Sequence, residues 1–360
     1  MTKSSLAAVP VPARALALAA AALLALAAGN ACACATCGCS LSTDAATGYP
    51  THAGWNLSLQ FDHIDQSQLR HGSKAVSTAD VAAINDAGGD QEVEHDTVTR
   101  TTTLGIAWAP DEDWGLRLLV PWVDRGHSTY ASATNPVTQD QLSTARIRGL
   151  GDIRLLVTWQ GLLEEHGLGL QLGLKLPTGH YGGPNADGSG VAGRHPAAFQ
   201  HGPLSTNASP DNLVDTSLQA GTGSTDIIVG AYYHQPVGTD VEAFVNAQFQ
   251  AAIASRLHGA GQDFRVGNTT FVSVGARWQA TPALVPQLQV NVSHKGADQG
   301  ALADNPDSEG TVVYVSPGVT GTLGDHWQAF GFVQLPVASH LAGYQLAPRW
   351  TASAGLNYAF

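Results

Sequence analysis

Apolar residues recur at every second position through most of the chain after residue 50. In the stretch 166–178, for example, Leu168, Leu170, Leu172, Leu174 and Leu176 alternate with Gly, Gln and Lys. A period of two gives a β-strand one apolar and one polar face. About twelve segments show it, each near the 9–11 residues that a tilted strand needs to cross a bilayer. They are 53–64, 96–109, 113–124, 150–160, 166–178, 223–235, 239–251, 265–279, 283–294, 310–321, 326–335 and 349–360.

The connections between these segments alternate strictly between short and long. Short turns are predicted at 109–113, 161–165, 236–239, 280–282 and 322–325, and long polar loops at 65–95, 125–149, 179–222, 252–264, 295–309 and 336–348. Outer-membrane barrels have this asymmetry, with short periplasmic turns and long external loops. An even number of strands also places both termini on the periplasmic side.

The polar positions are mostly Gly, Ser, Thr, Asn and Gln, which suits a water-lined interior better than the charged outer face of a soluble β-sandwich. Aromatic residues end many apolar faces, as the interfacial girdles of a membrane barrel require. They are Trp55, Trp108, Trp114, Trp122, Trp159, Tyr233, Trp278, Trp350 and Tyr358. The pattern therefore predicts an all-β fold, a transmembrane antiparallel up-and-down β-barrel of about 12 strands over residues 53–360, with a secreted sandwich as the alternative.

Composition narrows the function classes. The chain has 360 residues, with 17 Lys and Arg against 29 Asp and Glu. This acidic balance argues against a nucleic-acid partner. After residue 30 no apolar run approaches the roughly 20 residues of a spanning helix. Residues 1–31 carry a basic start, a Leu/Ala run over 16–28 and small residues after it, and we predict a secretory signal peptide, with a membrane anchor as the alternative.

Two glycine-rich pieces each open a predicted strand after a long loop. They are Gly149-Leu-Gly-Asp-Ile153 and Gly221-Thr-Gly-Ser-Thr-Asp-Ile227. With this layout the chain resembles Gram-negative outer-membrane β-barrels, and more narrowly the transporter family linked to meta-pathway phenol degradation. The resemblance implies passage of small, often aromatic or apolar molecules. The ending Asn357-Tyr-Ala-Phe360 resembles the signal that such barrels present to the barrel assembly machinery.

Several charged residues alternate out of phase with the apolar faces and are predicted to point into the lumen, because a charge on the lipid face near the midplane costs about 2–4 kcal/mol. These lumen and selectivity candidates are Arg117, Asp152, Arg154, Lys175, Asp226, Glu242 and Arg277. They could set the selectivity of a pore. The alternative is an internal ion-pair network that braces a narrow barrel.

All four cysteines lie in Cys32-Ala-Cys34-Ala-Thr-Cys37-Gly-Cys39, within a predicted periplasmic segment of residues 32–52. Disulfides are the default in an oxidising compartment. Four thiolates could instead hold copper or zinc as a metal site. Lipidation of Cys32 is a third alternative. No other cofactor is predicted.

The sequence therefore predicts an outer-membrane channel for passive movement of a small solute, in contact with outer-membrane lipid. The alternative is a metal-handling outer-membrane protein that uses Cys32, Cys34, Cys37 and Cys39, and a third class is a structural or adhesive barrel. Serines near loop histidines occur, but the sequence has no Gly-x-Ser-x-Gly elbow, so an enzyme is not predicted.

Overall fold

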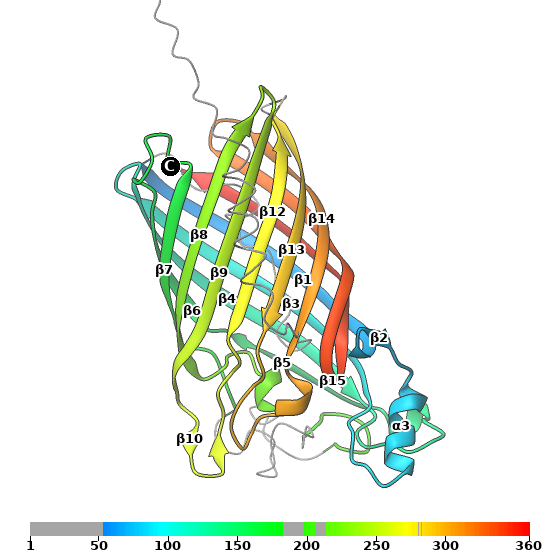
Figure 1. Ribbon diagram of the computed structural model, residues 1–360. Coiled ribbons are helices and arrows are strands. Elements are labelled where there is room, and N and C mark those ends of the chain that lie inside the picture. The colour runs from blue at the N-terminus through cyan, green and yellow to red at the C-terminus, as the bar shows by residue number, and fades with distance from the viewer. Residues whose placement is uncertain (1–52, 183–197, 206–213, 280, 282) are drawn as a thin grey trace, which may run out of the picture. The chain divides into compact units, whose positions relative to one another are not determined.

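The computed structural model describes residues 53–182, 198–205, 214–279, 281 and 283–360. Thirteen of its strands form one antiparallel closed sheet, and β10 and β11 form a separate two-stranded sheet (Figure 1). The predicted signal peptide, the cysteine segment 32–52 and the four cysteines lie outside the described residues. The strands are β1 (Gly54–Gly72), β2 (Lys74–Ala75), β3 (Glu94–Ala109), β4 (Trp114–Thr129), β5 (Ser143–Leu150), β6 (Ile153–Trp159), β7 (Leu168–Leu176), β8 (Ser224–Val237), β9 (Val241–Ser255), β10 (His258–Gly259), β11 (Gln262–Asp263), β12 (Thr269–Trp278), β13 (Leu284–Lys295), β14 (Gly310–Leu323) and β15 (Trp327–Ala359).

Helices occur only in the connections of the described chain. They are α3 (Thr78–Asp86) and the 3-10 turns η1 (Gln139–Gln141), η3 (Thr216–Leu218) and η4 (Asn305–Asp307). Ser77 and Asp80 form a capping box at the start of α3, and Val81 and Ala82 bury its inner face. None of these helices is long and apolar enough to cross a membrane.

The sheet closes because β15 pairs with β14 on one side and with β1 on the other. Eleven labelled strands form the ring, and β2 and β5 pair beside it. Residues 327–341 of β15 pair with β14, and residues 341–359 pair with β1, both antiparallel. A ring whose neighbours are all antiparallel needs an even number of strands, so the two arms of β15 count separately. The prediction of about twelve strands in an antiparallel barrel is consistent with this architecture.

Several strands are longer than the alternation predicts, so the predicted loops 65–95, 125–149 and 252–264 are wrong in part and 336–348 is wrong throughout. Strand β1 continues into 65–95, and the rest of β4 and all of β5 occupy much of 125–149. The end of β9 with β10 and β11 occupies much of 252–264, and 336–348 is entirely strand within β15. Beyond Trp122, for example, β4 continues with Asp124, Gly126 and Ser128 on its outer side. The strands remain hydrogen-bonded beyond Trp122. Their outward residues no longer contact lipid, so they need not be apolar, and the alternation on which the prediction rests is lost.

The outer wall carries the predicted apolar belt. On β4 the outward residues run from Trp114 to Trp122, which are 48% and 53% exposed. Eight residues at 3.3 Å each span about 26 Å along the strand, or about 20 Å of height at a tilt near 40°. At the short-turn end, Trp55 stacks on Trp108 with ring centroids 6.0 Å apart. These rings form the girdle that the sequence predicts.

The inner wall is polar, as predicted, but it is more closely packed than a water-lined interior. Gln289, Asn291 and Gln334 are fully buried, and the Asn291 amide donates to Ser316 Oγ at 2.8 Å and to Gln334 Oε1 at 3.0 Å. Inward aromatic rings fill space over glycines of neighbouring strands. A Cβ at Gly318 would lie 2.0 Å from a ring carbon of Phe332. The ring therefore lies flat against the wall only because residue 318 has no side chain.

Replacing Leu118, at the middle of the outward face of β4, with arginine should destabilise the barrel in lipid vesicles by about 2–4 kcal/mol, because the charge meets hydrocarbon. Urea unfolding in vesicles measures the loss. The matched control is Val237→Arg, since Val237 is an outward residue at the end of β8 and should cost about 0–1 kcal/mol. Equal losses at the two positions would contradict a membrane-embedded belt.

Candidate functional site

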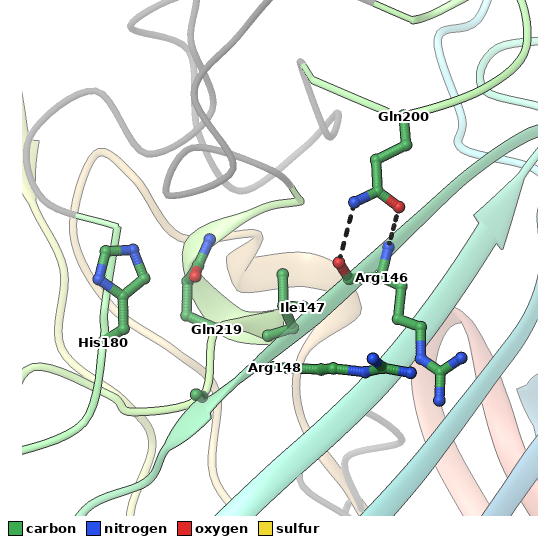
Figure 2. Close-up of a pocket in the computed structure, with 7 residues that line it drawn as sticks. Arg146, Ile147, Arg148, His180, Gln200 and Gln219 are labelled. Atoms are coloured by element: carbon green, nitrogen blue, oxygen red, sulfur yellow. Dashed lines mark hydrogen bonds between the residues drawn. The ribbon is translucent and has the colours of Figure 1, made fainter.

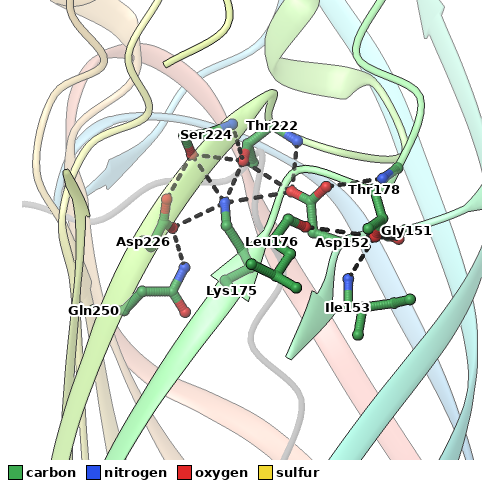
Figure 3. A network of polar contacts seen from close by, with 11 residues as sticks. Gly151, Asp152, Ile153, Lys175, Leu176, Thr178, Thr222, Ser224, Asp226 and Gln250 are labelled. Carbon is green, nitrogen blue, oxygen red and sulfur yellow. Dashed lines mark hydrogen bonds and ion pairs between the residues drawn. The ribbon is translucent and has the colours of Figure 1, made fainter. Parts of the chain in front are cut away.

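Lys175, near the loop end of β7, forms a buried ion-pair network with two of the predicted inward carboxylates (Figure 3). Its Nζ lies 2.8 Å from Asp226 Oδ2 and 3.3 Å from Asp152 Oδ2. The Lys175, Asp152 and Asp226 side chains are 3%, 6% and 1% exposed. Lys175 also donates to Thr222 Oγ1 and, at 3.0 Å, to Ser224 Oγ.

Both glycine-rich pieces converge on this lysine. Asp152 lies between β5 and β6, and its Oδ1 accepts from the backbone N–H of Gly179 at 3.1 Å. Its Oδ2 accepts from the N–H and the hydroxyl of Thr222, each at 2.9 Å. A Cβ at Gly221 would lie 2.6 Å from Asp152 Oδ1, so glycine is needed for this close approach.

The far side of the network belongs to β8 and β9. Asp226 pairs in register with Lys175, and its carboxylate accepts from Ser224 Oγ at 2.6 Å and from Gln250 Nε2 at 2.6 Å. Each buried charge is therefore paired and hydrogen-bonded, which is the condition for keeping charges out of water. At these exposures the network braces the inner wall, and a selectivity role for Asp152, Lys175 and Asp226 stays a prediction.

A second ion pair joins two further candidates at the short-turn end. Arg277 on β12 faces Glu242 on β9 in register, with Nη1 3.0 Å from Glu242 Oε1. The guanidinium carbon lies 4.7 Å from the centre of the Phe244 ring. His234 Nδ1 lies 3.6 Å from the other oxygen of Glu242. The structure thus brings together five of the seven predicted residues in two separate groups.

The remaining two candidates lie outside these groups. Arg117 is half-buried on β4 and alternates with outward leucines. Arg154 on β6 is exposed, and it forms no hydrogen bond or ion pair with the residues that the structure describes. It lies beside Lys175 in register, so the barrel carries a solvated cation next to a buried one.

A cavity of about 520 Å³ lies at the free edge of β5, where no other strand of the ring pairs with it (Figure 2). Its lining residues are Arg146, Ile147, Arg148, His180, Gln200, Gln219 and Ala220. Arg146 and Arg148 lie on the exposed face of β5, and Ile147 lies on its buried face. Because residues of both faces line the cavity, it extends around the edge of the strand. It is large enough for a small solute.

Loop residues complete the wall at this edge. The Gln200 side chain accepts from the Arg146 N–H at 3.0 Å and donates to the Arg146 carbonyl at 3.2 Å. Thr144 and His201 form a bridge beside them. The predicted loop over 125–149 hides this site, because it leaves no place for β5. The alternation of Arg146, Ile147 and Arg148 was the available signal.

Loop residues 214–218 enter the barrel mouth and carry a buried carboxyl group. Burial raises the pKa of Asp215, and the nearby Glu92 carboxylate adds to the rise, whereas a hydrogen bond from Ser217 opposes it. The Asp215 Oδ1 accepts from Ser217 Oγ at 2.6 Å and from the Leu218 N–H at 2.9 Å. The protonated form is therefore favoured by the folded state.

The metal-handling alternative depends on Cys32, Cys34, Cys37 and Cys39, which lie outside the described residues. Within residues 53–182, 198–205, 214–279, 281 and 283–360, no group of three or more His, Cys, Asp or Glu is placed to hold a metal ion. A copper or zinc site at the cysteines stays a prediction.

Comparisons with known proteins identify the fold as that of outer-membrane β-barrels. The COG4313 outer membrane channel from Pseudomonas putida F1 is similar at a TM-score of 0.58 and 12% identity, covering 89% of this chain and 100% of that chain. Two further similarities are weaker. They are the translocator domain of autotransporter NalP from Neisseria meningitidis, at TM-score 0.45 and 11% identity with 97% of both chains covered, and the P. putida toluene transporter TodX, at TM-score 0.39 and 9% identity with 85% and 90% covered. No family model and no curated protein matches the sequence.

Replacing Lys175 with methionine should cost about 3–5 kcal/mol of unfolding free energy, because it leaves two carboxylates buried without a cation. The double variant Lys175→Met/Asp226→Asn should recover a measurable part of that loss. Urea unfolding of the four members of the double-mutant cycle gives the coupling. The control Arg154→Gln removes an exposed cation and should change stability by about 0.5 kcal/mol at most. A coupling of zero between Lys175 and Asp226 would contradict the network.

The raised pKa of Asp215 should make the barrel less stable as pH rises. The unfolded carboxyl ionises near pH 4. The folded one ionises at higher pH, so its stabilising contribution is complete below pH 4 and is lost as pH rises through the folded pKa. Thermal unfolding across this range should show a decline that Asp215→Asn reduces. Asp240→Asn, at an exposed turn carboxyl, should leave the decline unchanged. Identical pH profiles for wild type and Asp215→Asn would contradict this account.

Proposed function

We propose that this protein is an outer-membrane channel for the passive movement of small apolar solutes, aromatic ones included. The observation that carries the proposal is the cavity at the β5 edge, set in the wall of a closed barrel with an apolar outer belt. A closed barrel satisfies its backbone in lipid, and a cavity in its wall offers a small molecule a place out of water.

The lining of the cavity fits a solute that combines a small apolar body with a polar group, as phenol does. Ile147 and Ala220 supply apolar surface, and the other five lining residues, Arg146, Arg148, His180, Gln200 and Gln219, are polar or charged. Such a combination is typical of small-molecule sites. The resemblance of the glycine-rich pieces to the phenol-degradation transporter family supports the same solute class. The shared fold with an outer membrane channel supports the membrane location.

The proposed orientation follows from the barrel asymmetry. The long connections face the cell exterior, and both termini face the periplasm. The Phe360 side chain is 71% exposed at the short-turn end, where it would be accessible to the barrel assembly machinery. Residues 1–31 would direct export and be removed.

Flux through the cavity can be tested in proteoliposomes with phenol as the apolar probe and glucose as the polar one. Ala220→Phe places a ring in the cavity and should lower phenol flux several-fold, because the free volume falls. Ala231→Phe is the matched control, since Ala231 lies on the outward side of β8. Phenol flux no faster than that of protein-free vesicles, or equal flux in the two variants, would contradict the proposal.

A further inference from the structure

The outer wall carries a cluster of arginines directly on the loop side of the apolar belt. Arg100 on β3 faces Asp124 on β4, and Asp124 faces Arg148 on β5. Arg146 lies one outward position further along β5. We call Arg100, Asp124, Arg146 and Arg148 the outer arginine cluster. It combines three cations with one carboxylate in a chain of net charge −12.

The carboxylate organises the cluster without neutralising it. Arg146 binds Asp124 through two hydrogen bonds, Nε to Oδ1 at 2.6 Å and Nη2 to Oδ2 at 2.5 Å. Arg148 Nε lies 3.2 Å from the same Oδ2. The Arg146 and Arg148 side chains are nevertheless 45% and 58% exposed. Figure 2 shows the two arginine side chains leaving β5 on the same side, with their guanidinium groups close to each other.

The cluster lies at headgroup depth. The outward pair just below it, towards the short turns, is Trp122 with Leu150, which are 53% and 36% exposed and mark the edge of the apolar belt. The next outward pair is Asp124 with Arg148, about 7 Å further along the strands. Aromatic residues lie at the membrane interface. The guanidinium groups are therefore at the level of lipid phosphates.

A bare patch of wall lies beside the arginines. Gly126 is the outward residue opposite Arg146, and a Cβ at this position would meet no atom within 4 Å. A second carboxylate, Asp65, is two strands away and accepts a hydrogen bond from Ser67. The open space at Gly126 is thus bordered by cations on the β5 side.

We propose that the outer arginine cluster binds the phosphate groups of the phosphorylated glycolipid of the outer leaflet. Guanidinium groups match phosphate geometry through paired, charge-assisted hydrogen bonds. Arg100 and Arg148 approach from either side of Asp124, and Gly126 leaves room for a phosphate against the wall. The inference depends on the proposed orientation, with the long connections in the outer leaflet, and extends the proposed function to a specific lipid partner.

The test is binding of bisphosphorylated lipid A to the full-length barrel in detergent, followed by native mass spectrometry and titration. The wild type should bind it more tightly than a zwitterionic phospholipid. Arg100→Gln/Arg148→Gln should weaken binding about tenfold through lost charge-assisted bonds. Gly126→Glu should do the same by filling the open space with a negative charge. Arg154→Gln, which removes a cation elsewhere, should bind like the wild type.

Further measurements separate the sources of the effect. Lipid A without phosphates should bind as weakly as the double variant, and excess inorganic phosphate should not displace the intact lipid. Unchanged affinity in Gly126→Glu and in the double variant would overturn the proposal, as would displacement by inorganic phosphate, which would indicate a simple anion site. Heat-modifiable migration in gels shows that each variant is folded. Binding is measured without flux, so failure of phenol transport would leave this result standing, and the reverse also holds.

Discussion

Closure of the sheet through β15 is the constraint on which the rest of the structure depends. Hydrocarbon offers no hydrogen-bond partner, so every backbone group of a spanning strand must be paired within the protein, at several kcal/mol for each failure. The pairing of β1 with residues 341–359 joins the first and last strands of the ring, and the Phe360 N–H extends this pairing by donating to the Trp55 carbonyl at 2.9 Å. Once the ring is closed, the two faces of every strand have fixed environments.

The part of the fold that the sequence could predict is the part that lipid selects. Between Trp114 and Trp122 every second residue meets hydrocarbon, so alternation identified the strand and its faces. Beyond Trp122 the outward face is polar, and the inward face of β4 and β5 carries only scattered apolar residues such as Val123 and Ile147, so the alternation weakens. The predicted loop over 336–348 fails in the same way, because these residues form strand pairs without a regular outward apolar pattern.

The sequence could predict which residues belong to the candidate site, but not which of them form ion pairs with one another. Alternation placed Asp152, Lys175 and Asp226 on the inner face, and all three are buried there. Their pairing depends on the register of β7 against β8, which a long connection separates in sequence. The packing of inward aromatic rings could not be predicted either, because it joins residues of different strands, such as Phe332 and Gly318. The cavity at the β5 edge depends on Gln200, whose side chain hydrogen-bonds to the backbone of Arg146. Gln200 lies in a loop, where the sequence shows no alternation that would predict this contact.

The position of Asp152 has a consequence for the connection between β7 and β8. One carboxylate accepts from the N–H of Gly179, close to where that connection begins, and from the N–H of Thr222, close to where it ends. The two ends of the connection are therefore both hydrogen-bonded to the Asp152 carboxylate. Loop-closure entropy grows by only about 0.6 kcal/mol for each doubling of length. A change in the length of this connection should therefore leave the register of β7 against β8 intact, provided that the residues which close the β5 edge, Gln200 among them, are kept.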